Sequence, residues 1–152
     1  MVKRVLETVF RKLSVMLWGS SSRTNPQDLF NGGSGQSMAR YLTHRGEFKG
    51  GIVRYSAFDP PKSLRKSVYW IAQIPEEEIW VIGDKHVAPA RGPILGRADF
   101  NSLAVYQNNL SIDLTGKPHP RHADIIGWSE DRKKARHEAQ KLADASTLVP
   151  RP

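Results

Sequence analysis

The sequence predicts an α+β domain with a mainly antiparallel sheet of four or five short strands and two or three helices, preceded by an N-terminal amphipathic helix. Three observations predict this fold. Short runs rich in β-branched and aromatic residues are separated by turn-forming Pro, Gly and Asp. Residues 110–114 alternate strictly between apolar and polar side chains, as in a half-buried strand. Residues 129–145 show helical periodicity, and no internal repeat indicates a solenoid or propeller.

Composition limits the function classes. The chain has 152 residues, of which 39% are hydrophobic and 25% charged, so it is expected to fold as one domain rather than remain disordered. Its net charge of +8 favours polyanionic partners such as RNA or DNA. The absence of cysteine excludes disulfides, thiolate nucleophiles and Cys-based metal sites. No apolar run reaches about 18 residues, so no transmembrane segment is predicted.

Residues 1–18 place Val2, Val5, Leu6 and Val9 at helical spacing among charged residues, which predicts a basic amphipathic helix. Three roles stay open for it: packing on the domain or on a partner protein, lying on a membrane surface, or serving as a transit peptide. The transit-peptide alternative follows from five basic residues and one acidic residue before position 28. We therefore expect a cytoplasmic protein, with the organellar matrix as the alternative.

Residues 19–37 are rich in Gly, Ser and Asn and are predicted to form a flexible linker. The alternative, a glycine loop that cradles phosphate, lacks the required Gly-Lys-Ser/Thr ending and a clear preceding strand. The domain itself is expected over residues 38–147, followed by a tail at residues 148–152.

Within the domain, residues 51–58 and 67–74 are predicted to be neighbouring strands around the turn at 59–61. Pro75 and the three glutamates after it indicate a helix start, although a strand over 79–82 stays open because Gly83 weakens the helix. Residues 88–96 are expected to be a loop.

A second helix is predicted from Asp99, as N-cap, to Asn108. Strands are predicted at 110–114 and 123–128. Ser129 is expected to cap a last, basic helix that runs to about Ala145.

The segment 117–122 (Lys-Pro-His-Pro-Arg-His) concentrates more potential chemistry than any other. One hypothesis makes His119 and His122 a general acid and base acting on a phosphodiester, with Arg121 stabilising the developing charge, as in metal-independent ribonucleases. A second treats the His-x-x-His-x-Asp spacing as part of a metal site completed by His86 or His44. The third is a surface turn whose histidines are satisfied by hydrogen bonds. We predict no metal and no cofactor.

Two arginines, Arg91 and Arg97, lie in a glycine-rich segment before the second predicted helix, where they are candidates for binding anions. The alternative is that Arg97 pairs with a nearby carboxylate such as Asp99. If this segment meets the 117–122 loop, the two form one phosphate-binding cleft with His86 near its edge.

The leading functional prediction is a small basic protein that binds nucleic acid or another phosphate-rich ligand through Arg91, Arg97, Lys117 and Arg121, with help from the C-terminal basic helix. Two alternatives stay open: a ribonuclease-like phosphodiesterase that uses His119 and His122, and an accessory subunit that docks on a protein partner through the N-terminal helix. Whether the chain is an enzyme and how it assembles are left open by the sequence.

Overall fold

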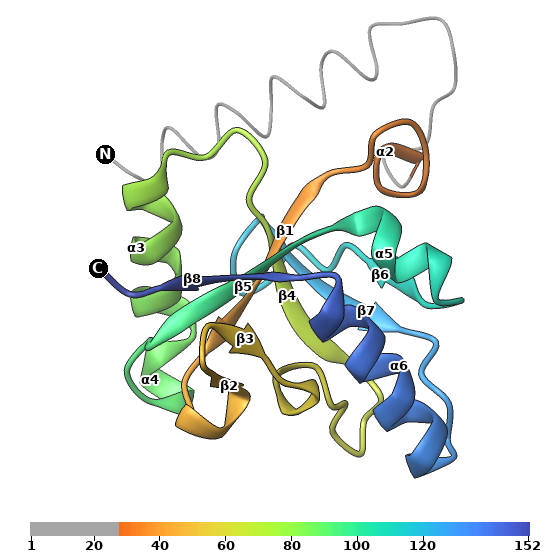
Figure 1. The fold of residues 1–152 in the computed structure, drawn as a ribbon. Helices are drawn as coiled ribbons and strands as arrows, with labels where there is room; N and C mark the ends of the chain where they lie inside the picture. Colours follow the sequence, from red (N-terminus) through yellow and green to blue (C-terminus); the bar gives the residue numbers. More distant parts are fainter. Residues whose placement is uncertain (1–27) are drawn as a thin grey trace, which may run out of the picture.

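A six-stranded antiparallel sheet forms the centre of the fold in a computed structural model, which describes residues 28–152 (Figure 1). The strand order is β6-β7-β4-β1-β5-β8. The strands are β1 (Ser37–Leu42), β4 (Lys66–Trp70), β5 (Gly96–Asn101), β6 (Ser111–Asp113), β7 (His122–Ile126) and β8 (Thr147–Pro150). A separate hairpin joins β2 (Phe48–Lys49) to β3 (Ile52–Val53), and single 3₁₀ turns occur at η1 (Arg45–Glu47) and η2 (Tyr55–Ala57).

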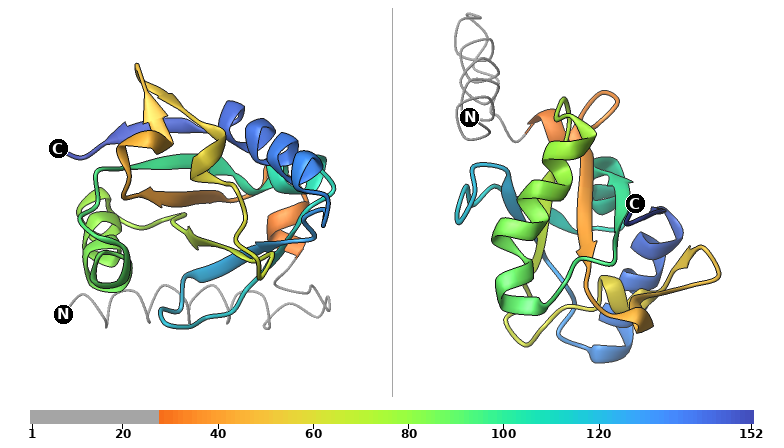
Figure 2. Two further views of the ribbon diagram at one scale, coloured as in Figure 1. Left: turned by 90° about the horizontal axis from the view of Figure 1, so that it is seen from below. Right: turned by 90° about the vertical axis from the view of Figure 1, so that its left-hand side faces the viewer.

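Helices cover both faces of the sheet (Figure 2). One face carries α3 (Glu76–His86) and α4 (Ala88–Arg91), and the other carries α2 (Asp28–Asn31), α5 (Ser102–Gln107) and α6 (Arg132–Asp144). Alternation along β1 divides the core accordingly. Met38 and Leu42 join the cluster under α5 and α6, whereas Ala39 and Tyr41 join the cluster under α3.

The α+β class and the antiparallel sheet are confirmed, but the sheet has six strands and the described residues contain five helices. The predicted helix after Pro75 is confirmed as α3, which excludes the alternative strand over 79–82. Its first turn holds three glutamates and its last turn holds Lys85 and His86. Acidic residues at the start and basic residues at the end of a helix interact favourably with the helix dipole.

The predicted strand over 51–58 is mostly wrong. Only Ile52 and Val53 of this segment lie in a strand, and they pair with β2 rather than with β4. Gly50 and Gly51 both have positive φ, so the chain reverses there into a tight hairpin. The chain then enters the η2 turn and leaves the sheet.

The second helix begins two residues later than predicted, with its N-cap at position 101 rather than 99, because β5 extends through the intervening segment. Arg97 and Asp99 alternate with the buried Ala98 and Phe100 along this strand. The N-cap is Asn101, whose Oδ1 accepts the backbone N–H of Leu103 at 2.9 Å.

The C-terminal residues, expected to form a tail from position 148, contribute strand β8 along the edge of β5. Leu148 and Val149 pack on opposite faces of the sheet, one on each core cluster. Asp131, not Ser129, is the N-cap of α6, and its carboxylate accepts the backbone N–H of Lys133. The loop predicted over 88–96 contains the short helix α4.

The predicted amphipathic helix over residues 1–18 lies outside the described residues, as do residues 19–27 of the predicted linker. The described part of that linker holds α2 and the start of β1. Across residues 28–152, every helix is too short or too polar to cross a bilayer.

Candidate functional site

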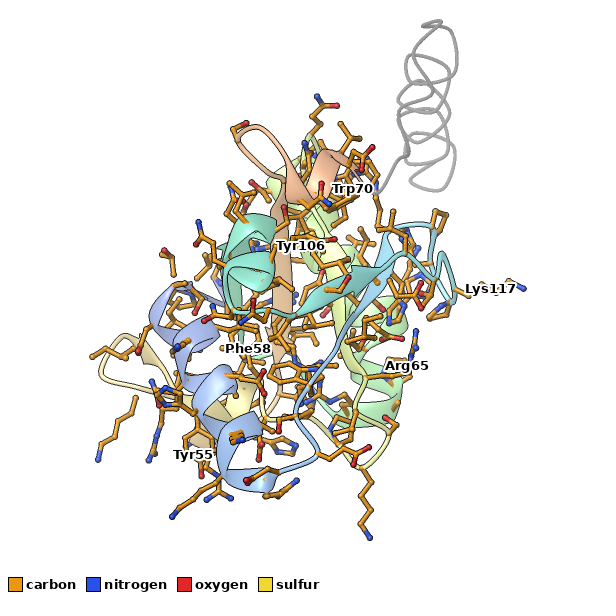
Figure 3. All side chains as sticks on the ribbon, turned by 90° about the vertical axis from the view of Figure 1, so that its right-hand side faces the viewer. Tyr55, Phe58, Arg65, Trp70, Tyr106 and Lys117 are labelled. Carbon is orange, nitrogen blue, oxygen red and sulfur yellow. The ribbon has the colours of Figure 1, made fainter. Side chains whose placement is uncertain are left out.

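The segment 117–122 connects β6 to β7 on the side of the molecule opposite α6 (Figure 3). Lys117 is exposed, but the residues after it turn inward. His119 is only 5% exposed and Arg121 only 1%. His122 opens β7 opposite Tyr69 of β4. The sheet edge therefore buries most of the chemistry that the sequence predicted for an open loop.

His119 lies against the last turn of α3. Its ring centroid is 5.1 Å from that of His86, and its Nδ1 accepts the backbone N–H of Arg121 at 3.0 Å. Burial, followed by the neighbouring His86, lowers the pKa of His119 to about 4. This lowered pKa favours the neutral imidazole at pH 7, whose remaining N–H is far too weak an acid for a general acid.

His122 is held at both ring nitrogens. Nδ1 is hydrogen-bonded to the hydroxyl of Thr115, and Nε2 lies 2.7 Å from the hydroxyl of Ser67. The carboxylate of Asp124 lies 3.8 Å from Nε2. Burial lowers the pKa of His122 below its usual value in spite of this carboxylate. Both nitrogens of a neutral imidazole are thus occupied by neighbouring side chains.

Both histidines lie beside the same aromatic ring, that of Tyr69. The centroid of Tyr69 lies 6.4 Å from the ring of His119 and 5.3 Å from that of His122. With one imidazole neutral and buried and the other fully hydrogen-bonded, this geometry lends no support to an acid and base acting on one phosphate. The ribonuclease-like hypothesis stays a prediction.

Arg121 points to the opposite face of the sheet from His122, as neighbouring residues of extended chain do. Its guanidinium carbon lies 4.1 Å from the centroid of Trp70, which belongs to the core under α5 and α6. Nη1 donates to the carbonyl of Ala72 at 3.1 Å, whereas Nε and Nη2 are buried without a hydrogen-bond partner. Burial lowers the pKa of Arg121 to about 10.

Arg97 fits the alternative of carboxylate pairing. On β5 it is 3% exposed, donates to both carboxylate oxygens of Glu76 at 2.7 and 2.8 Å, and donates to Asp99 at 2.8 Å. Its guanidinium also covers the ring of Trp80 at 4.7 Å. Although burial opposes it, these carboxylates raise the pKa of Arg97 above its usual value.

The cleft expected between the Arg91–Arg97 segment and the 117–122 loop is assembled only in part. His86 meets His119, as the sequence analysis expected, but β4 and β1 separate β5 from β7. Arg97 is therefore separated from the histidines by the width of two strands.

Arg91 ends α4 and faces a different group. Its Nη2 lies 3.9 Å from the carboxylate of Glu47, and its charge helps to lower the pKa of Arg40 on β1 and of Lys66 on β4, for both of which burial is the larger cause. Sequence reasoning missed Arg40 and Lys66 as site candidates. One signal was available, because alternation in 38–42 places Arg40 on the same face as the core residues Met38 and Leu42.

The His-x-x-His-x-Asp spacing does not gather metal ligands in the described structure. Over residues 28–152, no three His, Asp or Glu side chains are placed to hold one ion. Asp124 is instead bound by Arg65, which also pairs with Asp113.

A groove of about 660 Å³ lies on the α6 side of the molecule, between the end of α5 and α6. One wall carries the side chains of three amide residues and the other carries cationic side chains of the helix. The amide residues are Gln107, Asn108 and Asn109. The helix contributes Lys133, Lys134, His137 and Lys141.

The acids that line this groove are already engaged in the fold. Asp131 caps α6 by accepting backbone N–H groups of its first turn. Glu138 accepts the backbone N–H of Ser129 at 3.0 Å. The lining lysines Lys133, Lys134 and Lys141 outnumber these two carboxylates, so the groove is cationic on balance. On the adjoining face of the helix, Arg136 lies over the ring of Tyr55 at 5.2 Å.

Comparison of the chain with protein-family models, with curated proteins and with solved structures found no match.

Proposed function

We propose that this chain is a nucleic-acid-binding module that holds single-stranded RNA or DNA along α6. The groove between α5 and α6 is the observation that carries the proposal. Its volume of about 660 Å³ lies within the range typical of small-ligand sites, which is large enough for one or two nucleotides.

The two walls supply the two kinds of contact that nucleic-acid recognition needs. Lys133, Lys134 and Lys141 are exposed and positioned to neutralise phosphates, which releases counterions and makes binding depend steeply on salt. The amides of Gln107 and Asn109 are also exposed and offer donors and acceptors to base edges. The net charge of +8 adds a long-range attraction.

The site differs from the one expected on Arg91, Arg97, Lys117 and Arg121. Two of those residues, Arg97 and Arg121, are almost fully buried, and Arg97 is neutralised by carboxylates. The basic C-terminal helix, expected to assist them, becomes the principal surface in this proposal.

The test is the salt dependence of binding to a short fluorescent single-stranded RNA, measured by fluorescence anisotropy. We expect the double variant Lys134→Gln/Lys141→Gln to lower the affinity at low salt. The slope of log K against log salt should fall by about 0.7 for each phosphate contact removed.

The matched control is Lys85→Gln/Lys117→Gln, which removes the same charge from exposed positions in α3 and in the 117–122 loop. Lys117 lies on the opposite side of the molecule from α6 (Figure 3). Affinity and slope should stay near those of the unmodified protein. Equal losses of affinity in both double variants would mean that only the net charge matters, which would contradict the proposal. A larger loss in the control would place binding at the 117–122 loop instead.

A further inference from the structure

A second cationic site lies where β1 ends and β4 begins, away from the α6 groove. Arg40 on β1 reaches the carbonyl of Ser67, the residue after Lys66 on β4, and Arg91 at the end of α4 lies 3.9 Å from the carboxylate of Glu47. The charge of Arg91 acts on both of the other cations. The three cations come from elements far apart in the sequence, so the fold itself brings like charges together.

The hydrogen bonds fix two of these cations in place. Arg40 is 5% exposed and donates from Nε to the carbonyl of Ala57 at 3.0 Å and from Nη1 to the carbonyl of Ser67 at 2.9 Å. Lys66 donates from Nζ to the carbonyl of Asp59 at 2.9 Å. Both are bound to neutral carbonyl groups, so neither forms a direct ion pair among the described residues.

The neighbouring carboxylates Glu47 and Asp59 balance only part of this charge. One oxygen of Glu47 is occupied by the backbone N–H groups of Thr43 and His44. The other lies 3.9 Å from Arg91, beyond hydrogen-bond distance. Asp59 is shared with Arg132, whose Nη2 lies 3.6 Å from its carboxylate.

Within residues 28–152, two donors in this part of the fold lack hydrogen-bond partners, and so does one acceptor, Oδ1 of Asp59. Nη1 of Arg91 is buried without a hydrogen bond. The hydroxyl of Thr43 is likewise without a partner, and that residue is only 8% exposed. Unpaired buried donors and excess charge both cost folding free energy, and an anion that accepts from these groups removes both costs.

We propose that Arg40, Lys66 and Arg91 form a binding site for a phosphate group, with the Thr43 hydroxyl as a further donor. Guanidinium groups match the oxygens of a phosphate, and a dianionic monoester balances more of the charge than a phosphodiester does. Burial and the charges of Arg40 and Arg91 lower the pKa of Lys66 to about 7, and a bound dianion reverses the second of these effects. This site does not depend on nucleic-acid binding at α6.

The probe is inorganic phosphate, measured by isothermal titration calorimetry and by thermal unfolding in buffers of equal ionic strength set with chloride. Phosphate is expected to raise the melting temperature in a saturable manner. Arg91→Gln should weaken phosphate binding by about tenfold or more. Arg54→Gln, which removes an exposed charge from the neighbouring hairpin segment, is the matched control and should bind as before.

Two further ligands distinguish the sources of the phosphate. A dinucleotide with a 5′-phosphate should bind if the site takes the end of a nucleic acid, and the same dinucleotide with a 5′-hydroxyl should not. Binding of inorganic phosphate without the phosphorylated dinucleotide would assign the site to the free anion.

Lys66 provides a readout that does not depend on the arginine variants. After reductive methylation with ¹³C-formaldehyde, the pKa of Lys66 can be followed by NMR, and it should be higher when phosphate is present. The proposal is overturned if phosphate gives no saturable binding, or if Arg91→Gln and Arg54→Gln bind it equally.

Discussion

The guanidinium of Arg121 lies 4.1 Å from the ring centroid of Trp70 and pairs with no carboxylate of residues 28–152, although Arg121 is only 1% exposed. Its one described hydrogen bond runs to the carbonyl of Ala72, and burial is the cause of its lowered pKa. The arginine contributes packing and a cation–π contact at the cost of a buried, incompletely bonded charge.

Replacement of Arg121 separates these contributions. Arg121→Met keeps most of the contact with Trp70 and removes the buried charge, so we expect a free energy of unfolding equal to or above that of the unmodified protein. Arg121→Ala loses the packing and should be less stable by about 2–3 kcal/mol. Urea denaturation measures both, and a methionine variant less stable than the alanine variant would contradict this account.

His119 predicts a dependence of stability on acid. Because its pKa is about 4 in the fold and about 6.5 when unfolded, the unfolded chain binds a proton first as the pH falls. The contribution to stability is complete above about pH 6.5 and is lost as the pH falls from 6.5 to 4, by up to about 3 kcal/mol.

The measurement is urea unfolding at several pH values between 7 and 4. His119→Gln should lose less stability over this interval than the unmodified protein does. His44→Gln, at an exposed position, is the control and should follow the unmodified protein. Parallel curves for all three proteins would show that His119 is not the group that titrates.

The group formed by Arg97, Glu76 and Asp99 predicts a structural role for this arginine. Arg97→Gln leaves the half-buried carboxylate of Asp99 without its cation, and burial already raises the pKa of that carboxyl group. We expect a loss of about 3 kcal/mol in the free energy of unfolding. In a double-mutant cycle with Asp99→Asn, the losses should be clearly less than additive. Additive losses, or a reduced affinity for RNA with unchanged stability, would instead favour a ligand-binding role.

Gly83 lies in the middle of α3, where its missing side chain admits the ring of Tyr41. A Cβ at this position would approach Cε1 of Tyr41 to 2.7 Å. Gly83→Ala should therefore destabilise the fold by about 1–3 kcal/mol, although alanine favours helices. Lys85→Ala, exposed in the same helix, should be nearly neutral. A stabilised Gly83→Ala protein would mean that α3 packs less closely on β1.

The same glycine illustrates what the sequence could predict. Proline and three acids indicate the start of α3, and strict alternation indicates β6, because both signals are local. Gly83 would weaken an isolated helix, but here it makes room for the ring of Tyr41. Because Tyr41 lies some forty positions away, no local sequence pattern indicates this contact. Strand β8 was missed for a related reason, since a four-residue segment with a proline is stable only because β5 offers it an edge.

The candidate sites divide in a similar way. A place for His86 beside the 117–122 segment was expected only if the Arg91–Arg97 segment met that loop, and a contribution of the basic helix α6 to binding stays a prediction. The groove itself depends on the end of α5 lying beside α6, and the phosphate site depends on β1, β4 and α4 converging. Burial of Arg121 follows from tertiary packing, which a charge count does not contain, whereas the pairing of Arg97 with Asp99 was one of the alternatives that the sequence offered.

The most direct test of nucleic-acid binding at α6 is to follow the backbone amide signals of the protein by NMR while a short single-stranded RNA is added. The account predicts that the largest shift changes occur in residues 107–109 and 129–141, and that they diminish as salt is raised. Changes confined to residues 115–122, or no changes at any RNA concentration, would contradict it.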